Sequence, residues 1–193
     1  SSNIMPADWV KIVEAVNSVY EDYDGIVITH GTDTMANSAA AVSFGLRNIN
    51  KAIVFTGSQA TLDVLGSDAP FNLENAFRVV TADIAQVVIS FGHYIHSGVR
   101  AVKKSESAYD AFESPITGPI GSIQSEIKWT GQEKKKKPAS NSPVVFQPKF
   151  ISGILSIQSS PPMEPWMVAN LAKTGRVKGI LFEALGAGNI AQH

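Results

Sequence analysis

The residues most able to do chemistry are Thr32-Asp33-Thr34, which follow a short apolar run at residues 26–29 and precede an alanine-rich helical pattern. A carboxylate can bind an ammonium group, hydroxyls can position or activate a nucleophile, and the N–H groups at a helix start can hold an anion. These residue types are also common helix caps, so capping of the next helix is an alternative interpretation. In either case polar groups gather where a strand meets a helix, which is where α/β proteins place ligands.

A second polar turn, Gly57-Ser58-Gln59, follows another apolar run at residues 52–56. The carboxyl ends of adjacent parallel strands meet at one edge of a sheet, so we expect this turn and the tripeptide around Asp33 to share a crevice. The pairing of two polar strand ends favours a binding pocket over capping alone.

A lysine is the candidate partner for a threonine nucleophile. A threonine hydroxyl is weak at neutral pH and needs a base or a nearby cation. Lys103 and Lys104 follow a third apolar run, and one of them can lie beside Thr32 with a partly buried amine and a lowered pKa. Adjacent lysines in a turn are also ordinary surface charges, and the sequence leaves the choice between them open.

The histidines and glycines predict neither a metal site nor a nucleotide cofactor. His93 and His96 are three residues apart, but no third ligand stands at metal-binding spacing nearby. His30 is interpreted as a structural hydrogen-bonding residue. The glycine patterns of phosphate-binding and dinucleotide-binding loops do not occur.

Composition describes a globular chain without strong electrostatic partners. Of the 193 residues, 44% are hydrophobic and 17% charged, and the formal net charge is -1, which gives no general attraction to nucleic acid. No cysteine is present, which excludes disulfides and thiolate chemistry. No apolar run approaches the roughly 20 residues that cross a bilayer, so no membrane partner is expected.

Apolar patterns alternate between helix and strand, which predicts an α/β fold with a doubly wound, mainly parallel, flavodoxin-like sheet. Asn72 is predicted to cap the helix that begins at residue 73. The expected helices are residues 9–20, 35–46, 73–84 and 165–174, and the expected strands are residues 26–29, 52–56, 86–91, 151–157 and 179–184, with short strands and turns from residue 100 to residue 129.

A composition shift divides the chain into two predicted domains. Residues 133–143 hold a run of four lysines followed by proline, alanine, serine and asparagine, which is typical of a solvated linker. The lysines lack interleaved aromatic residues, so a linker is favoured over a nucleic-acid patch. The larger domain is therefore placed at residues 1–132 and the start of a smaller α/β domain at residues 144–193.

Taken together, these motifs resemble the bacterial-type L-asparaginase family, in particular its type I, usually cytoplasmic, branch. The resemblance runs over essentially the whole chain. It is carried by residues 28–35, the turn at residues 56–59, Ser67-Asp68-Ala69-Pro70, and the spacing of Arg100, Lys103 and Asp110-Ala111-Phe112.

The resemblance implies hydrolysis of L-asparagine to L-aspartate and ammonia through a threonine acyl-enzyme, without a cofactor. By position, Thr32 matches the family's threonine on the rigid strand-end loop, Asp33 the carboxylate that receives the substrate α-ammonium, and Lys103 the lysine linked to that threonine. Ser1 and Ser2 match the positions where the family holds the substrate α-carboxylate. Ser58 matches the segment near the side-chain amide, and Asn189 matches a residue that reaches a neighbouring subunit's site. A homodimer or homotetramer is implied.

One departure from the family pattern concerns the nucleophile. Members carry an N-terminal segment with a Thr-Gly-Gly-Thr-Ile-type motif whose second threonine attacks the substrate, and this sequence contains no such motif. We therefore expect the chain to be a fragment that also lacks most of the smaller C-terminal domain. Activity is then expected of the parent protein.

Two other functions stay open at this point. The amidohydrolase component of a tRNA-dependent amidotransferase resembles the same fold and would need tRNA as partner. A non-catalytic amino-acid-binding fragment is the second. Asparagine and glutamine cannot be told apart here, because one methylene changes discrimination by only about 1–3 kcal/mol and depends on pocket shape.

Overall fold

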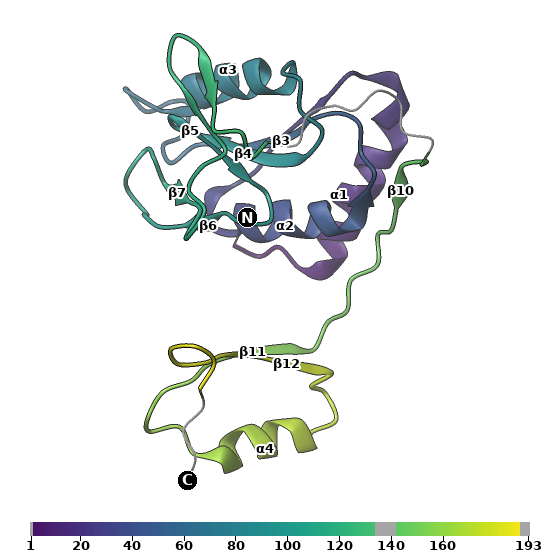
Figure 1. The fold of residues 1–193 in the computed structure, drawn as a ribbon, viewed down its shortest axis with the longest axis vertical. Helices are drawn as coiled ribbons and strands as arrows, with labels where there is room; N and C mark the ends of the chain where they lie inside the picture. The colour runs from purple at the N-terminus through teal and green to yellow at the C-terminus, as the bar shows by residue number, and fades with distance from the viewer. Residues whose placement is uncertain (1, 134–141, 190–193) are drawn as a thin grey trace. The chain divides into compact units, whose positions relative to one another are not determined.

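The computed structural model describes residues 2–133 and 142–189, which belong to two compact units that divide between Lys149 and Phe150 (Figure 1). Unit 1 contains a six-stranded sheet with helices on both of its faces, and unit 2 contains a strand, a helix and a strand. The predicted α/β class is confirmed.

Three parallel strands form the part of the sheet that carries the predicted motifs. They are β1 (Ile26–Thr29), β3 (Ile53–Thr56) and β4 (Val87–Phe91), in that order across the sheet. Every residue of β3 and β4 is buried, because helices cover both faces. Strands of this kind have continuous apolar runs without alternation, which is why they could be predicted from sequence.

Helices on the two faces of the sheet complete the doubly wound arrangement. α1 (Pro6–Val19) and α2 (Met35–Gly45) lie on one face, and α3 (Ala69–Val80) lies on the other (Figure 1). The first helix begins at Pro6, with the typical first-turn residues proline and Asp8, and is followed by the 3-10 turn η1 (Tyr20–Asp22). The Trp9 indole N–H donates to the Ser38 hydroxyl (3.1 Å), which ties α1 to α2.

The far half of the sheet is antiparallel. It continues from β4 through β5 (Tyr94–Ser97), β8 (Gly121–Ile123) and β9 (Ile127–Trp129). Only two residues join β4 to β5, and so short a connection makes a hairpin, whereas a parallel crossover needs a dozen or more. Two small ribbons pair β6 (Val102–Lys103) with β7 (Phe112–Glu113), and β2 (Leu46–Arg47) with β10 (Val145–Phe146).

The pairing of β10 with β2 bears on the domain boundary. Residues 145–149 belong to unit 1, although the composition shift grouped them with the second domain. Most of the predicted linker, including the four lysines at residues 134–137, lies outside the described residues.

The start of α3 differs from its prediction. The helix begins at Ala69, with Asp68 at the N-cap position and Pro70 in the first turn, so Asn72 is an interior residue and its prediction as the cap is wrong. Asn72 is fully buried and its side chain bonds to neighbouring loops instead. Proline in the first turn starts a helix without losing a hydrogen bond, which fixes the earlier boundary.

Unit 2 consists of β11 (Ile154–Gln158), α4 (Pro165–Lys173) and β12 (Gly179–Glu183), with β11 and β12 parallel. The predicted strand, helix and strand are confirmed. Among the described residues of either unit, no helix is long and apolar enough to cross a bilayer.

His96 gives unit 1 a testable pH dependence. Burial lowers its pKa to about 4, helped by the charge of Lys104 and opposed by that of Asp110. An unfolded histidine titrates near 6.5, so between about pH 6.5 and 4 the unfolded state binds a proton that the folded state rejects. We expect the free energy of unfolding to fall by on the order of 3 kcal/mol across that window as pH decreases.

The measurement is urea denaturation of the wild-type chain and His96→Gln at several pH values from 8 to 4.5. Above pH 7.5 this residue contributes no slope, so that range serves as the internal control. The variant should lose the corresponding part of the slope at lower pH, and identical slopes in the two proteins would contradict the assignment.

Candidate active site

Two polar strand ends meet at the carboxyl edge of the parallel strands. The register pairs Thr29 of β1 with Thr56 of β3, and the His30 N–H donates to the Thr56 carbonyl (2.8 Å). The chain then continues through Gly31 into the short 3-10 turn η2 (Thr32–Thr34) and α2. The two polar strand ends therefore share one edge of the sheet, as expected, and the crevice between them stays a prediction.

Gly57 is a glycine because the two strand ends approach closely. A Cβ atom at this position would lie 2.1 Å from the carbonyl oxygen of His30, far inside van der Waals contact. Only a residue without a side chain lets the turn after β3 lie against the turn after β1. The close approach holds the Asp33 segment and the Ser58 segment together.

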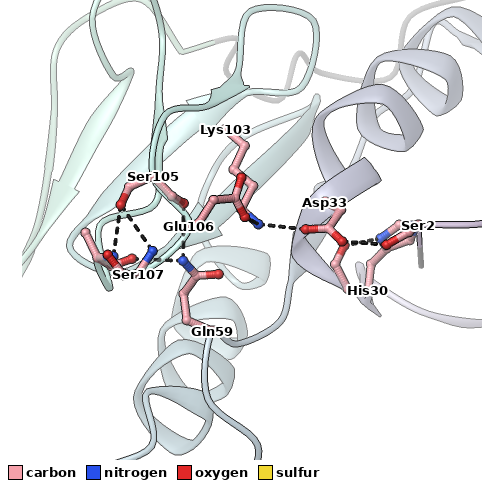
Figure 2. A network of polar contacts seen from close by, with 10 residues as sticks. Ser2, His30, Asp33, Gln59, Lys103, Ser105, Glu106 and Ser107 are labelled. Carbon is pink, nitrogen blue, oxygen red and sulfur yellow. Dashed lines mark hydrogen bonds and ion pairs between the residues drawn. The ribbon is translucent and has the colours of Figure 1, made fainter.

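Asp33 joins Lys103 to Ser2 in the polar network drawn in Figure 2. One of its carboxylate oxygens accepts a hydrogen bond from the Lys103 amine (2.7 Å) and the other from the Ser2 hydroxyl (2.5 Å). The hydrogen bond from Lys103, and to a lesser extent that from Ser2, holds the pKa of Asp33 below its usual value. The lowered pKa keeps the carboxylate ionised, and its half-exposed side chain makes it accessible.

Capping does not account for the tripeptide. The N-cap position of η2 is Gly31 and that of α2 is Thr34, and neither makes a side-chain capping hydrogen bond. The Asp33 carboxylate bonds to Lys103 and Ser2 rather than to the start of the helix.

Lys103 is a largely buried cation that bonds to two carboxylates. Its side chain is only 10% exposed, and its amine lies 2.7 Å from Asp33 and 2.6 Å from Glu106. Burial by itself lowers the pKa of Lys103, but the hydrogen bonds and charges of the two carboxylates outweigh it, so the pKa is raised above 10.5. The predicted lowering of the lysine pKa is therefore wrong. The prediction assumed an uncharged threonine beside the amine, whereas two charged carboxylates bond to it.

Of the two candidate lysines, Lys103 is the one that pairs with Asp33. Lys103 forms the ion pair, whereas the backbone N–H of Lys104 bonds to the Ala111 carbonyl (2.8 Å) and its charge acts on His96.

A second layer of hydrogen bonds fixes the turn after β3. The Asp68 carboxylate accepts from the backbone N–H groups of Gln59 (3.0 Å) and Ala60 (3.0 Å) and from the side-chain amide of Asn72 (2.9 Å). Asn72 also donates to the Gly57 carbonyl (2.9 Å) and accepts from the Gly92 N–H (2.8 Å). One buried asparagine thereby joins the turns that follow β3 and β4.

The other predicted site residues are placed less closely together. Thr32 and Ser58 lie on the two strand-end turns, but their hydroxyls make no hydrogen bond with another described residue. Ser1 lies outside the described residues. Asn189 belongs to unit 2, so its role at the site remains a prediction. The imidazole Nδ1 of His30 bonds to the Gly31 carbonyl (2.7 Å), in keeping with its structural interpretation.

Sequence reasoning missed Glu106, and it named Gln59 only as part of the polar turn, without a contact of its own. Glu106 follows Lys103 by three residues, and this spacing is the only signal the sequence offers. The side-chain amide of Gln59 donates to the carbonyls of Ser105 and Ala108 (both 3.2 Å), which ties the turn after β3 to the loop after Lys103. Within residues 2–133 and 142–189, no three acidic or histidine side chains group closely enough to hold a metal ion.

Comparison with known proteins identifies the family. The model of the family described as "Asparaginase, N-terminal" matches residues 1–135. The chain belongs to the asparaginase family. L-asparaginase 1 of Escherichia coli is 34% identical over 194 residues, which cover 100% of this chain and 56% of that protein. The chain therefore spans little more than half the length of this asparaginase.

Solved asparaginases share the fold. The structure of L-asparaginase I from Vibrio cholerae matches with a TM-score of 0.92 at 32% identity, covering 100% of this chain and 58% of that one. A probable cytoplasmic L-asparaginase from Campylobacter jejuni matches with a TM-score of 0.82 at 26% identity, covering 100% and 62%. One component of the Glutamyl-tRNA(Gln) amidotransferase of Pyrococcus abyssi is 33% identical over 199 residues, covering 98% of this chain and 45% of that protein.

Asn72 offers a test of how the strand-end turns of this asparaginase-family chain are held. Asn72→Ala removes one hydrogen-bond partner each from the Gly57 carbonyl, the Asp68 carboxylate and the buried Gly92 N–H, so we expect about 3 kcal/mol of destabilisation by urea denaturation. Glu74→Ala, at an exposed position of the same helix, is the matched control and should change stability by less than about 0.5 kcal/mol. Equal effects of the two variants would show that Asn72 does not hold the turns.

Proposed function

We propose that the protein containing this chain hydrolyses L-asparagine to L-aspartate and ammonia without a cofactor. Family membership and the similarity to E. coli L-asparaginase 1 support an amidohydrolase. The observation that carries the proposal is the ionised, half-exposed Asp33 carboxylate at the strand ends, oriented by Lys103 and Ser2. Such a carboxylate complements the α-ammonium group of an amino acid.

Each residue of the site takes a role in this proposal. Asp33 receives the α-ammonium, and Ser1 and Ser2 bind the α-carboxylate, Ser2 by turning its hydroxyl from Asp33 to the substrate. Ser58 lies beside the side-chain amide. Lys103, with its raised pKa, acts as a fixed positive charge that stabilises alkoxide character on Thr32 and not as a general base.

The chemical step in the proposal uses a threonine nucleophile. Its hydroxyl oxygen attacks the carboxamide carbon, the C–N bond breaks with release of ammonia, and water then hydrolyses the acyl-enzyme to give aspartate. We place this nucleophile in a part of the parent protein beyond these 193 residues, with Thr32 in a supporting role.

Assembly and location are also proposals. Asn189 reaching a neighbouring subunit's site would make the protein a homodimer or homotetramer. Cytoplasmic location is supported by the resemblance to the type I branch and by the fold shared with the C. jejuni protein.

Binding of L-asparagine and L-aspartate by isothermal titration calorimetry tests the role of Asp33. Asp33→Asn removes a charge-assisted contact, so we expect about 10- to 100-fold weaker binding. Asp83→Asn, which makes the same change at an exposed position after α3, is the matched control and should bind normally. Unchanged binding by Asp33→Asn would contradict the proposed role.

Ammonia release tests the assignment of the nucleophile. The 193-residue chain by itself is expected to bind ligand and to release no ammonia from asparagine. Turnover by this chain that is lost in Thr32→Val would make Thr32 itself the nucleophile.

A second candidate function is the ammonia-releasing component of a tRNA-dependent amidotransferase. The similarity to the amidotransferase protein of P. abyssi favours it. A gel shift of labelled tRNA that weakens with added salt would support this candidate. The asparaginase proposal expects no shift at physiological salt, because the net charge of -1 supplies no general attraction to phosphate.

A further inference from the structure

Lys103 bonds to two carboxylates, and the proposed roles use only one of them. Its amine lies 2.7 Å from Asp33 and 2.6 Å from Glu106, which comes from the loop between β6 and β7 (Figure 2). Two carboxylates facing one ammonium leave the cluster with one net negative charge. Asp33 is needed for the ligand's ammonium group, so Glu106 supplies the excess charge.

The loop that carries Glu106 is pinned on both sides of that residue. The Ser105 hydroxyl accepts from the N–H groups of Ser107 (3.3 Å) and Ala108 (3.0 Å), and Gln59 donates to the carbonyls of Ser105 and Ala108. The Glu106 side chain is 82% exposed. The bonds on either side of Glu106 nevertheless hold the loop where its carboxylate meets the Lys103 amine. The contact is therefore built by the fold of the loop and by its tie to the turn after β3.

We propose that Glu106 is a specificity-determining positioning residue: by sharing the Lys103 ammonium with Asp33, it keeps the site negative and disfavours a ligand with a side-chain carboxylate. This rests on the proposed function, in which the ligand's ammonium group sits on Asp33. Charges in physiological salt interact over about one Debye length, roughly 8 Å, so we expect a side-chain carboxylate on a ligand held at Asp33 to feel the net negative charge of this cluster. Aspartate is repelled, and the neutral amide of asparagine is not, which favours substrate over product.

The test compares the affinities of L-aspartate and L-asparagine by calorimetry for the wild-type chain, Glu106→Gln and Glu106→Asp. Glu106→Gln should improve aspartate binding relative to asparagine by about three- to tenfold. Glu106→Asp keeps the charge and should restore most of the wild-type ratio. Glu113→Gln removes a charge from an exposed position on the neighbouring strand β7 and should leave the ratio unchanged.

An independent readout is the titration of Lys103, followed by NMR of lysine labelled at the ε-carbon. Glu106→Gln should lower the pKa of Lys103, and Glu113→Gln should not. A lysine titration that is the same in all variants overturns the positioning role. An aspartate-to-asparagine ratio unchanged by Glu106→Gln, or changed equally by Glu113→Gln, overturns the specificity role.

Failure of the underlying function gives a different result. If the wild-type chain binds neither amino acid, the proposed function fails and the specificity role fails with it. The lysine titration still decides whether Glu106 holds Lys103, because it needs no ligand.

Discussion

The register of β1 against β3 places Thr29 opposite Thr56, so the chain leaves both strands at the same level. Everything at the candidate site follows from this constraint. Parallel strands must end at one edge, and the absence of a side chain at Gly57 lets the two turns lie in contact. A one-residue slip would move the neighbouring polar segments apart and turn the side chains of β1 to the other face.

Charge balance fixes the protonation states of the charged residues at the site. Lys103 is largely shielded from water, which disfavours its charged form, yet two carboxylates bond to it and keep it protonated. The hydrogen bond from Lys103 to Asp33, together with that from Ser2, keeps Asp33 ionised. Each member of the pair thus fixes the protonation state of the other, and the half-exposed carboxylate is left ready for a cationic group.

Much of the fold was predictable, and the reason is visible in particular elements. β3 and β4 are covered on both faces, so their sequences are unbroken apolar runs bounded by polar turns. The cap assigned to Asn72 failed because residue type does not distinguish a helix cap from a buried asparagine that bonds to adjacent turns. The antiparallel half was predicted only as short strands and turns, because its pairing depends on hairpins that very short strands specify weakly.

The sequence by itself determined the alternation of strands and helices, the two polar strand ends and, through its motifs, the asparaginase family. These are local properties, set by hydrophobic period and by residues adjacent in the chain. Only the tertiary structure decided that Lys103 and not Lys104 meets Asp33, that Glu106 shares its amine, and that the lysine pKa rises. Asp33 and Lys103 are 70 residues apart, and the energy of their pairing depends on distance and solvent exposure, which no local pattern contains.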